Sequence, residues 1–346
     1  MTGRIGRAVG AAVLAAAAAV SVAAPTMAGQ TLDAVRERGE IVCGVNSDVP
    51  GFSAQDESGA WSGMDVDYCR ALAAALFGDP EAVSFRPLTT EERFTALQAG
   101  EVDVLSRNTT WTLSRDAALG LSFAGIIFYD GQGFLVPRDL GATTSLALDG
   151  AAVCVQTNTT TQSNLAEFFA TRNMRYDEVP YERPEDAAQA FFSGDCDVLT
   201  SDRSQLAAVR AGAEADPEDY VILPETISNE PLGPAVRHGD EAFLDIARWV
   251  LFALIEAEEN GITSQNCVQM RDSSPNPEVA RLLGAEPGLG EALGLSETWA
   301  LDAIRAVGNY GEIYARNVGQ ETPLGLERGL NDLWLRGGLM YAMPFR

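Results

Sequence analysis

The chain has 346 residues, of which 46% are hydrophobic and 21% charged, and this balance excludes an intrinsically disordered protein. Its formal net charge is −25, so it lacks the cationic surface that binds nucleic acids, and we expect no nucleic-acid partner. All 24 basic residues are Arg, which excludes lysine-based covalent catalysis. The single His, His238, leaves little room for a histidine metal site, and we expect neither a metal nor a cofactor.

The first 28 residues have the pattern of a secretory signal peptide. Arg4 and Arg7 precede an apolar run over residues 8–20, and small residues around Ala28 suit a cleavage site. A transmembrane anchor is the alternative, but the run is rich in Ala and ends at Pro25. We therefore expect cleavage near residue 28, a periplasmic location, and no membrane insertion of the mature chain.

The five cysteines fit an exported protein with disulfides. No two of them have CxxC spacing, so neither a zinc site nor a thioredoxin motif is indicated. An oxidising compartment favours disulfides, and two pairs each join a strand to an element about one strand–helix unit away. We predict the bonds Cys43–Cys69 and Cys154–Cys196, with Cys267 unpaired. The alternative is that several cysteines are simply small buried hydrophobic side chains.

Strands and helices alternate in the first third of the chain. Apolar residues at helical spacing over 64–77 predict a helix that stops at Gly78. The predicted elements are a helix at 31–38, a strand at 40–45, a helix at 64–77, a strand at 83–88, a helix at 90–99 and a strand at 102–106. This order is typical of a parallel sheet with helices on its faces.

The same order of elements returns further along the chain, so we expect two similar α/β units. The second unit has predicted strands at 152–156, 176–179 and 197–201, with helices at 159–170 and 184–193. Two short extended segments that contain Gly or Pro follow the units, at 131–136 and 231–236, and we expect them to pair between two lobes. An amphipathic helix is predicted at 243–259.

These patterns predict a chain that crosses twice between its lobes. The predicted division is a signal peptide at 1–28, lobe one at 30–133 plus 235–346, lobe two at 136–232, and hinges near 133–136 and 232–235. We expect the C-terminal stretch from Ser264 to wrap lobe one and not to reach the cleft.

Six segments together carry a family resemblance. They are Gly63–Cys69 (GMDVDYC), Arg93–Leu105 (RFTALQAGEVDVL), Ser106–Arg115 (SRNTTWTLSR), Tyr129–Val136 (YDGQGFLV), Pro231–Arg237 (PLGPAVR) and Val307–Ile313 (VGNYGEI). They resemble the periplasmic amino-acid-binding proteins of ABC importers, which are bacterial extracellular solute-binding proteins of family 3. The resemblance is strongest to the general L-amino-acid and glutamate/glutamine/aspartate/asparagine-binding subgroup. It implies the type II periplasmic-binding-protein fold, in which two α/β lobes joined by two crossover strands close over a ligand.

The resemblance assigns the charged ends of an amino acid to opposite lobes. It places Arg115 on the α-carboxylate, with Thr110 and Asn108 in the same loop, where open α/β sheets bind ligands. The alternative is an ordinary surface loop. The resemblance makes Asp202 the partner of the α-ammonium. The alternative for Asp202 is a structural role in a turn.

The second lobe offers an anion site at a helix start. Gln156, Thr159 and Thr160 follow a predicted strand and open a helix, whose free N–H groups attract a carboxylate. A plain helix cap is the alternative interpretation, and it is compatible with the first.

Four further residues are candidate partners of the ligand side chain. Asp48 and Phe52 lie in the loop after the first strand, where Phe52 would cover an aliphatic part of the ligand or else be a core aromatic residue. Arg93 matches the position where family members that bind acidic ligands carry a side-chain-reading Arg, and Arg107 is a second candidate. For both arginines the alternative is a solvated surface position.

The resemblance therefore implies a monomeric extracytoplasmic protein that captures L-amino acids, polar or acidic, and delivers them to an ABC permease without chemical change. One alternative is a periplasmic enzyme on the same scaffold, such as a cyclohexadienyl-type dehydratase. Such an enzyme needs a general acid or base in the cleft, whereas Asp202 already has an ammonium group to neutralise. A sensor module that presents amino acids to a membrane receptor is a third reading, which the sequence does not separate from transport.

Overall fold

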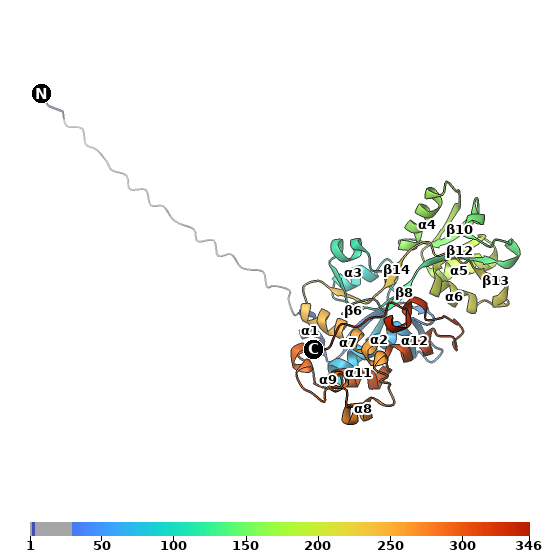
Figure 1. Cartoon of the computed structure of the whole chain (residues 1–346). Coiled ribbons are helices and arrows are strands. Elements are labelled where there is room, and N and C mark those ends of the chain that lie inside the picture. The colour runs from blue at the N-terminus through green and yellow to red at the C-terminus, as the bar shows by residue number, and fades with distance from the viewer. Residues whose placement is uncertain (1, 4–29) are drawn as a thin grey trace.

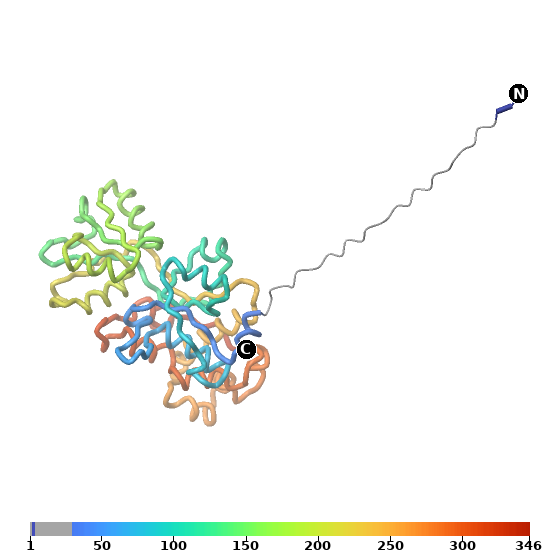
Figure 2. Tube along the Cα trace, turned by 180° about the vertical axis from the view of Figure 1, so that it is seen from behind, coloured from blue at the N-terminus to red at the C-terminus, as the bar shows by residue number. Residues whose placement is uncertain are grey.

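The computed structural model describes residues 2–3 and 30–346, so the predicted signal peptide lies outside the described residues. The described chain forms two lobes joined by a narrow waist (Figures 1 and 2). Within residues 2–3 and 30–346, no helix is long and apolar enough to cross a membrane.

Lobe one is built on a mixed five-stranded sheet. Its strands, in spatial order, are β5 (Val83–Pro87), β1 (Ile41–Val45), β6 (Val104–Leu105), β15 (Ala235–Arg237) and β7 (Leu121–Phe123). Strand β1 pairs in parallel with β5 and β6, whereas β15 is antiparallel to both of its neighbours. Because β15 follows lobe two in the chain, the sheet of lobe one is completed only after the chain returns.

Lobe two repeats this plan. Its strands, in spatial order, are β11 (Asp177–Tyr181), β10 (Ala152–Gln156), β12 (Val198–Asp202), β9 (Gln132–Pro137) and β13 (Tyr220–Ile222). Strand β10 is parallel to β11 and β12, and β9 is antiparallel to its neighbours. Its helices are α4 (Thr160–Thr171), α5 (Pro184–Ser193) and α6 (Arg203–Ala211). The predicted type II fold, with two α/β lobes, is confirmed.

Two crossover strands connect the lobes, and the first of them differs in position from the sequence expectation. Strands β8 (Phe128–Asp130) and β14 (Glu230–Leu232) pair antiparallel. The predicted crossover at 131–136 instead forms most of β9, which belongs to the sheet of lobe two. Its residues Phe134 to Val136 are fully buried, and this burial explains why the segment joins a sheet core and does not bridge the lobes.

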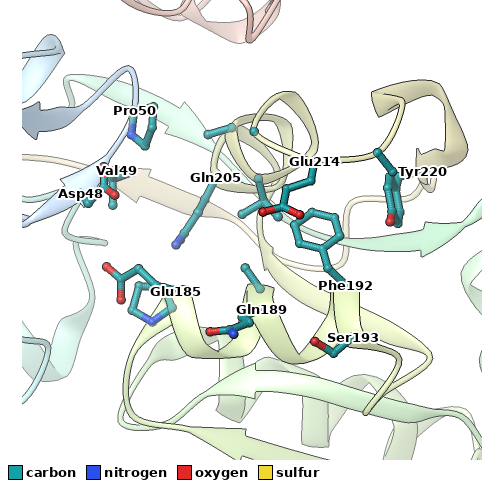
Figure 3. Close-up of a pocket in the computed structure, with 16 residues that line it drawn as sticks. Asp48, Val49, Pro50, Glu185, Gln189, Phe192, Ser193, Gln205, Glu214 and Tyr220 are labelled. Atoms are coloured by element: carbon teal, nitrogen blue, oxygen red, sulfur yellow. The ribbon is translucent and has the colours of Figure 1, made fainter. Parts of the chain in front are cut away.

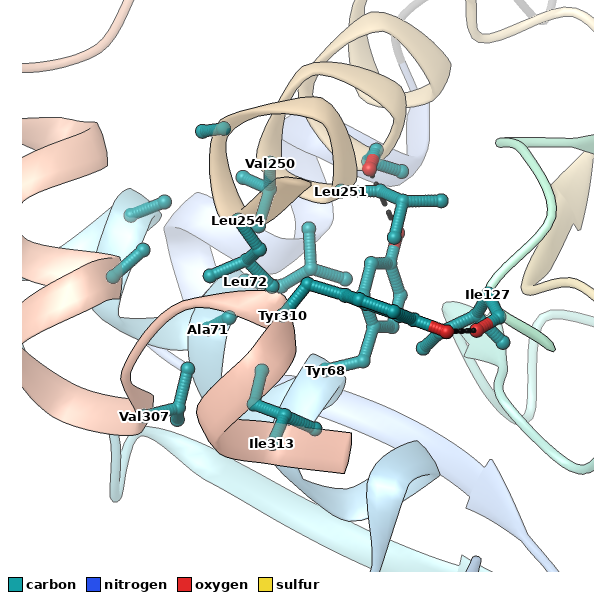
Figure 4. Packing of buried hydrophobic residues seen from close by; sticks show 14 of the residues in the cluster. Tyr68, Ala71, Leu72, Ile127, Val250, Leu251, Leu254, Val307, Tyr310 and Ile313 are labelled. Carbon is teal, nitrogen blue, oxygen red and sulfur yellow. Dashed lines mark hydrogen bonds between the residues drawn. The ribbon is translucent and has the colours of Figure 1, made fainter. Parts of the chain in front are cut away.

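The helices of lobe one are α1 (Gln30–Arg38), α2 (Met64–Phe77), α3 (Arg93–Gln98), α7 (Glu241–Glu259), α8 (Cys267–Ser273), α9 (Pro277–Leu282), α10 (Leu289–Leu293), α11 (Trp299–Val307) and α12 (Tyr310–Asn317). Helix α3 packs in a smaller cluster with Leu105 and Phe123, whereas the other helices pack into one large core. Two buried tyrosines satisfy their hydroxyls inside this core: Tyr68 donates to the Ala247 carbonyl at 2.8 Å, and Tyr310 to the Ile127 carbonyl at 2.9 Å (Figure 4). A small three-stranded sheet lies beside the core and consists of β2 (Asp48–Val49), β3 (Ser53–Gln55) and β4 (Trp61–Ser62).

Each lobe contains one disulfide. Cys43 on β1 is bonded to Cys69 on α2, and Cys154 on β10 is bonded to Cys196, which precedes β12. Cys267 is free and buried. The predicted pairing is therefore confirmed, and in both lobes the bond attaches a central strand to a neighbouring element.

The C-terminal stretch lies against lobe one and also reaches the back of the crossover. The Asn331 side chain accepts a hydrogen bond from the Tyr129 amide at 2.6 Å and donates to the Tyr129 carbonyl at 3.0 Å. Arg328 forms an ion pair with Glu258 on α7 at 3.0 Å. These contacts attach the tail to crossover strand β8 without adding a residue to the pocket between the lobes.

Candidate functional site

A small pocket lies between the lobes, beside the carboxyl ends of β1, β6, β10 and β12. This is where open α/β sheets bind their ligands. Its volume is about 40 Å³. Lobe one lines it with Asn46, Val49, Arg93, Arg107, Asn108, Thr110 and Arg115. Lobe two lines it with Gln156, Thr159, Thr160, Thr161, Pro184, Ser201, Asp202 and Gln205.

The structure gathers most of the residues that the sequence singled out, but not all. Arg93, Asn108, Thr110, Arg115, Gln156, Thr159, Thr160 and Asp202 all line this pocket. Phe52 does not: it is 1% exposed, and its ring packs edge-on against Phe128 at 5.3 Å. Asp48 is exposed and lines a larger neighbouring cavity instead. For Phe52 the core alternative therefore describes the geometry, because the apolar ring lies under the loop and away from the polar pocket.

Lobe one places three buried guanidinium groups at the pocket. Arg115 lies in the helical turn η1 (Ser114–Ala118), and its Nη1 donates to the Thr110 carbonyl at 2.8 Å. Arg107 donates from Nε to the Leu88 carbonyl at 2.9 Å, and Nε of Arg93 is buried with no hydrogen-bond partner among the described residues. Burial lowers the pKa of all three, that of Arg107 to about 10, and the neighbouring cations contribute to the lowering for Arg93. This wall of the pocket is therefore prepared for an anion.

A buried carboxylate fixes the loop that carries these cations. Asp65, on α2, accepts hydrogen bonds from the Ser106 hydroxyl at 2.7 Å and from the Asn108 amide at 2.9 Å. Burial raises the pKa of Asp65 to about 6, although the charge of Arg107 acts in the opposite direction. Sequence analysis missed this role, and the only signal for it was a pair of acids, Asp65 and Asp67, in the first turn of the helix.

Lobe two contributes a carboxylate to the opposite wall. Asp202 is the last residue of β12 and is buried. Within the described residues, no hydrogen bond holds its carboxylate. Burial raises the pKa of Asp202 well above its usual value, and the negative charges of Asp130 and Glu230 raise it further, against the opposing effect of Arg115. A bound cationic group would relieve this unfavourable environment.

The start of α4 supplies polar groups next to Asp202. The Thr159 hydroxyl accepts from the Gln162 amide at 3.1 Å, so its side chain caps the helix as the alternative interpretation held. Gln156 reaches across the interface, and its Nε2 donates to the Thr90 hydroxyl of lobe one at 2.9 Å. The two lobes are therefore in direct polar contact at the edge of the pocket.

Glu230 on β14 is the principal residue that sequence analysis missed. It is 1% exposed, and its carboxylate accepts hydrogen bonds from Thr110 of lobe one at 2.7 Å and from Thr160 of lobe two at 3.0 Å. Asn164 and Ser228 complete its shell at 2.7 and 2.6 Å. The available signal was a single acid in a Pro- and Gly-rich crossover segment. Glu230 therefore connects both lobes, through Thr110 and Thr160, to the crossover strand β14.

The fold and this pocket define a class of protein. Two α/β lobes joined by two crossover strands enclose a site that has cations on one wall and a carboxylate on the other. This is the architecture of the two-lobe periplasmic binding proteins, which hold a small solute between their lobes.

Comparison with known proteins agrees: the chain belongs to the bacterial extracellular solute-binding proteins of family 3, whose profile matches residues 41–265. It is 50% identical over 332 residues to the general L-amino acid-binding periplasmic protein AapJ of Rhizobium johnstonii, covering 95% of this chain and 97% of the relative. It is also 50% identical to the glutamate/glutamine/aspartate/asparagine-binding protein BztA of Rhodobacter capsulatus, covering 95% and 97% of the two chains. A solved ABC transporter periplasmic binding protein from Brucella ovis, with glutathione bound, has 52% identity and a TM-score of 0.89, covering 91% of this chain and 99% of its own.

Proposed function

We propose that this protein captures an L-α-amino acid, polar or acidic, between its lobes and delivers it to the permease of an ABC importer from the periplasm. The observation that carries the proposal is the placement of buried Arg115 and buried Asp202 in one interlobe pocket. A zwitterion needs a cation and an anion in this arrangement. The names of the relatives that cover nearly the whole chain support the same function.

In the proposed complex, each charged group of the ligand has its own partners. The Arg115 guanidinium holds the α-carboxylate, together with the backbone amides of Thr159 and Thr160 at the start of α4. For Thr110 to share the α-carboxylate, its hydroxyl turns away from Glu230, to which it donates in this structure. The Asp202 carboxylate holds the α-ammonium. Both pairs are charge-assisted hydrogen bonds in a desolvated site, where such bonds are strong.

The ligand side chain faces the remaining polar groups of the pocket. Arg93 and Arg107 favour a second carboxylate, as in glutamate or aspartate. Asn108 and Gln156 carry amides that both donate and accept, so they suit the neutral amides of asparagine and glutamine. This set of groups supports a specificity for polar and acidic side chains.

The lobes close around the ligand by bending at the crossover. We place the hinge at β8 and β14, because this pair is the narrow connection between the two sheets. Since the ligand's partners come from both lobes, bound ligand stabilises the closed form by its higher affinity for that form. The permease then recognises the closed form. The protein acts as a monomer.

Binding without chemistry fits the site better than catalysis does. The relatives are named as binding proteins. An enzyme of the dehydratase type would need a free general acid or base, whereas Asp202 is committed to the ligand ammonium. Incubation with arogenate or prephenate tests this point directly, and we expect no product to form.

A second class of ligand has a specific observation in its favour. The structure from Brucella ovis carries glutathione. The γ-glutamyl part of glutathione has a free α-ammonium and a free α-carboxylate, which are the two groups that Asp202 and Arg115 would hold. Glutathione therefore belongs in the ligand screen beside the free amino acids.

The screen measures the melting temperature of the ligand-free protein with each of the twenty L-amino acids and with glutathione. A ligand that binds the folded state stabilises it by RT ln(1 + c/Kd), where c is the free ligand concentration, so at equal concentration a tighter ligand raises the melting temperature more. We expect the largest increases among Glu, Gln, Asp and Asn, and calorimetry then measures their dissociation constants. If neither the amino acids nor glutathione stabilise the protein, the proposed function is wrong.

A further inference from the structure

A second and much larger cavity opens beside the amino-acid pocket. Its volume is about 850 Å³, compared with about 40 Å³ for the inner pocket. Val49, Pro184 and Gln205 line both, so the two spaces are adjacent across these three side chains. Its walls are the segment that carries Asp48 in lobe one and helices α5 and α6 in lobe two (Figure 3).

The cavity has the character of a ligand site. It lies at a domain interface and falls within the usual volume range of small-molecule pockets. Phe192 and Tyr220 form an aromatic pair at its wall, with ring centroids 5.0 Å apart, and Val209 adds apolar surface. Gln189 and Ser193 supply polar groups on the same helix as Phe192. An apolar side chain with a polar backbone would suit this lining.

The charged residues that line the cavity are all acidic. Asp48, Glu185 and Glu214 line it, and none of its described lining residues is an Arg. Figure 3 shows Glu185 opposite Asp48 and Val49 of lobe one, and Glu214 close to Phe192 within lobe two. Arg183 offsets part of the charge of Glu185, with Nε to Oε2 at 3.3 Å, but this Arg is 66% exposed and its effect is screened by solvent. A negatively charged group would therefore meet net repulsion here.

We propose that this outer cavity is a second subsite, which takes the second residue of a γ-glutamyl dipeptide and favours an uncharged over an anionic C-terminus. The proposal rests on the proposed function, because the glutamyl α-ammonium and α-carboxylate occupy the inner pocket. The γ-amide leads from that pocket past Val49 and Pro184. The second side chain then packs on Phe192 and Tyr220, and its C-terminal group lies among the acids.

The test compares three probes by calorimetry: L-glutamate, γ-L-glutamyl-L-leucine and the C-terminal amide of that dipeptide. We expect the amide to bind about tenfold more tightly than the free acid, because a carboxylate a few ångströms from a partly solvated acid loses about that factor. Phe192→Ala should weaken the binding of the dipeptide amide by about tenfold. The same variant should leave the affinity for L-glutamate unchanged, since Phe192 does not line the inner pocket.

The matched charge variants are Glu185→Gln and Glu214→Gln, each of which keeps the side-chain shape. Each should reduce the preference for the amide over the acid. If the protein binds L-glutamate but neither dipeptide, the subsite is wrong and the amino-acid function stands. If acid and amide bind equally, the charge selection is wrong. If no probe binds, the failure lies with the proposed amino-acid site itself.

Discussion

The two lobes share one sheet plan but bring opposite charges to the pocket. Lobe one contributes three buried arginines, Arg93, Arg107 and Arg115, whereas lobe two contributes Asp202 and the start of α4. Both sets line the pocket beside the carboxyl ends of the strands, so the shared fold places them and the local sequence sets their charge. Each half-site is electrostatically unsatisfied by itself, and a zwitterion between the lobes compensates both.

The lobes also differ in how they are stabilised. Lobe one has a large core that includes α2, α7 and α11 and is enlarged by the C-terminal helices, together with a smaller cluster around Leu97 and Phe123. Lobe two has two smaller clusters, one around Phe134 and Phe169 and one around Leu135 and Phe191. A lobe with less buried apolar surface depends more on its disulfide.

The largest expected effect on binding comes from removing either charge of the pair. Arg115→Ala and Asp202→Ala should each weaken binding of L-glutamate by about 2–5 kcal/mol, because each leaves a buried charged group of the ligand without its partner. Calorimetry measures the loss. Arg138→Ala is the matched control, since Arg138 is exposed on lobe two and, among the described residues, forms its ion pair with exposed Glu218 at 3.5 Å. Unchanged affinity in both pocket variants would mean that the site lies elsewhere.

Removing a disulfide should destabilise the protein by about 3–4 kcal/mol in the chain-entropy model. The closed loops span 26 residues in lobe one and 42 in lobe two, so the model predicts the larger loss for Cys154→Ser with Cys196→Ser. Chemical denaturation of both double variants, followed by fluorescence, gives the comparison. A larger loss for the Cys43 and Cys69 pair would contradict our view that lobe two is the more dependent lobe.

A smaller and selective effect is expected at Arg93. Its Nε is buried and unpaired, so a ligand carboxylate would give it a partner that the ligand-free protein lacks. Arg93→Ala should weaken the binding of L-glutamate by about 1.5–3 kcal/mol, which is the usual range for a hydrogen bond to a charged group. The same variant should weaken the binding of L-glutamine by less. Calorimetry with the two ligands on one variant contains its own control. Equal losses would assign Arg93 to the pocket wall and not to side-chain recognition.

The smallest expected effect is on the pH dependence of stability. The pKa of Asp202 is raised in the folded protein, so above the unfolded pKa the folded state holds a proton that the unfolded state releases. The free energy of unfolding therefore decreases as the pH rises from the unfolded pKa through the folded pKa. Asp130, whose burial raises its pKa to about 6, acts in the same direction. Ligand-free Asp202→Asn should therefore melt at a higher temperature than the wild type at pH 8, and the difference should narrow towards pH 5. A difference that does not change with pH would refute the raised pKa.

Local rules in the sequence were sufficient for most elements. The helices at 64–77 and 184–193 and the strand at 152–156 were predicted with the bounds that the structure shows. Both helices end at a glycine with a left-handed backbone, Gly78 and Gly194, which is a stop signal that lies within a few residues. The strand predicted at 102–106 is shorter, because only Val104–Leu105 pairs with neighbours on both sides.

The errors concern residues whose roles depend on the other lobe or on distant elements. Glu230 is decisive only because Thr110 and Thr160, far from it in the chain, donate to it. Asp65 depends in the same way on Asn108. For Phe52, the prediction favoured the cleft slightly over the core, and the contact of Phe52 with Phe128 is a long-range one. Tertiary contacts of this kind have no local pattern.

The central claim is that each lobe reads one charge of the same ligand, and deleting those charges from the ligand tests it most directly. Calorimetry with L-glutamate, glutarate and γ-aminobutyrate compares the full ligand with forms that lack the ammonium or the α-carboxylate. For the wild type, we predict that both shortened ligands bind at least about thirtyfold more weakly. In Asp202→Asn, the preference for L-glutamate over glutarate should nearly vanish, while the preference over γ-aminobutyrate persists. If Asp202→Asn discriminates against glutarate as strongly as the wild type does, lobe two does not read the ammonium, and the account is contradicted.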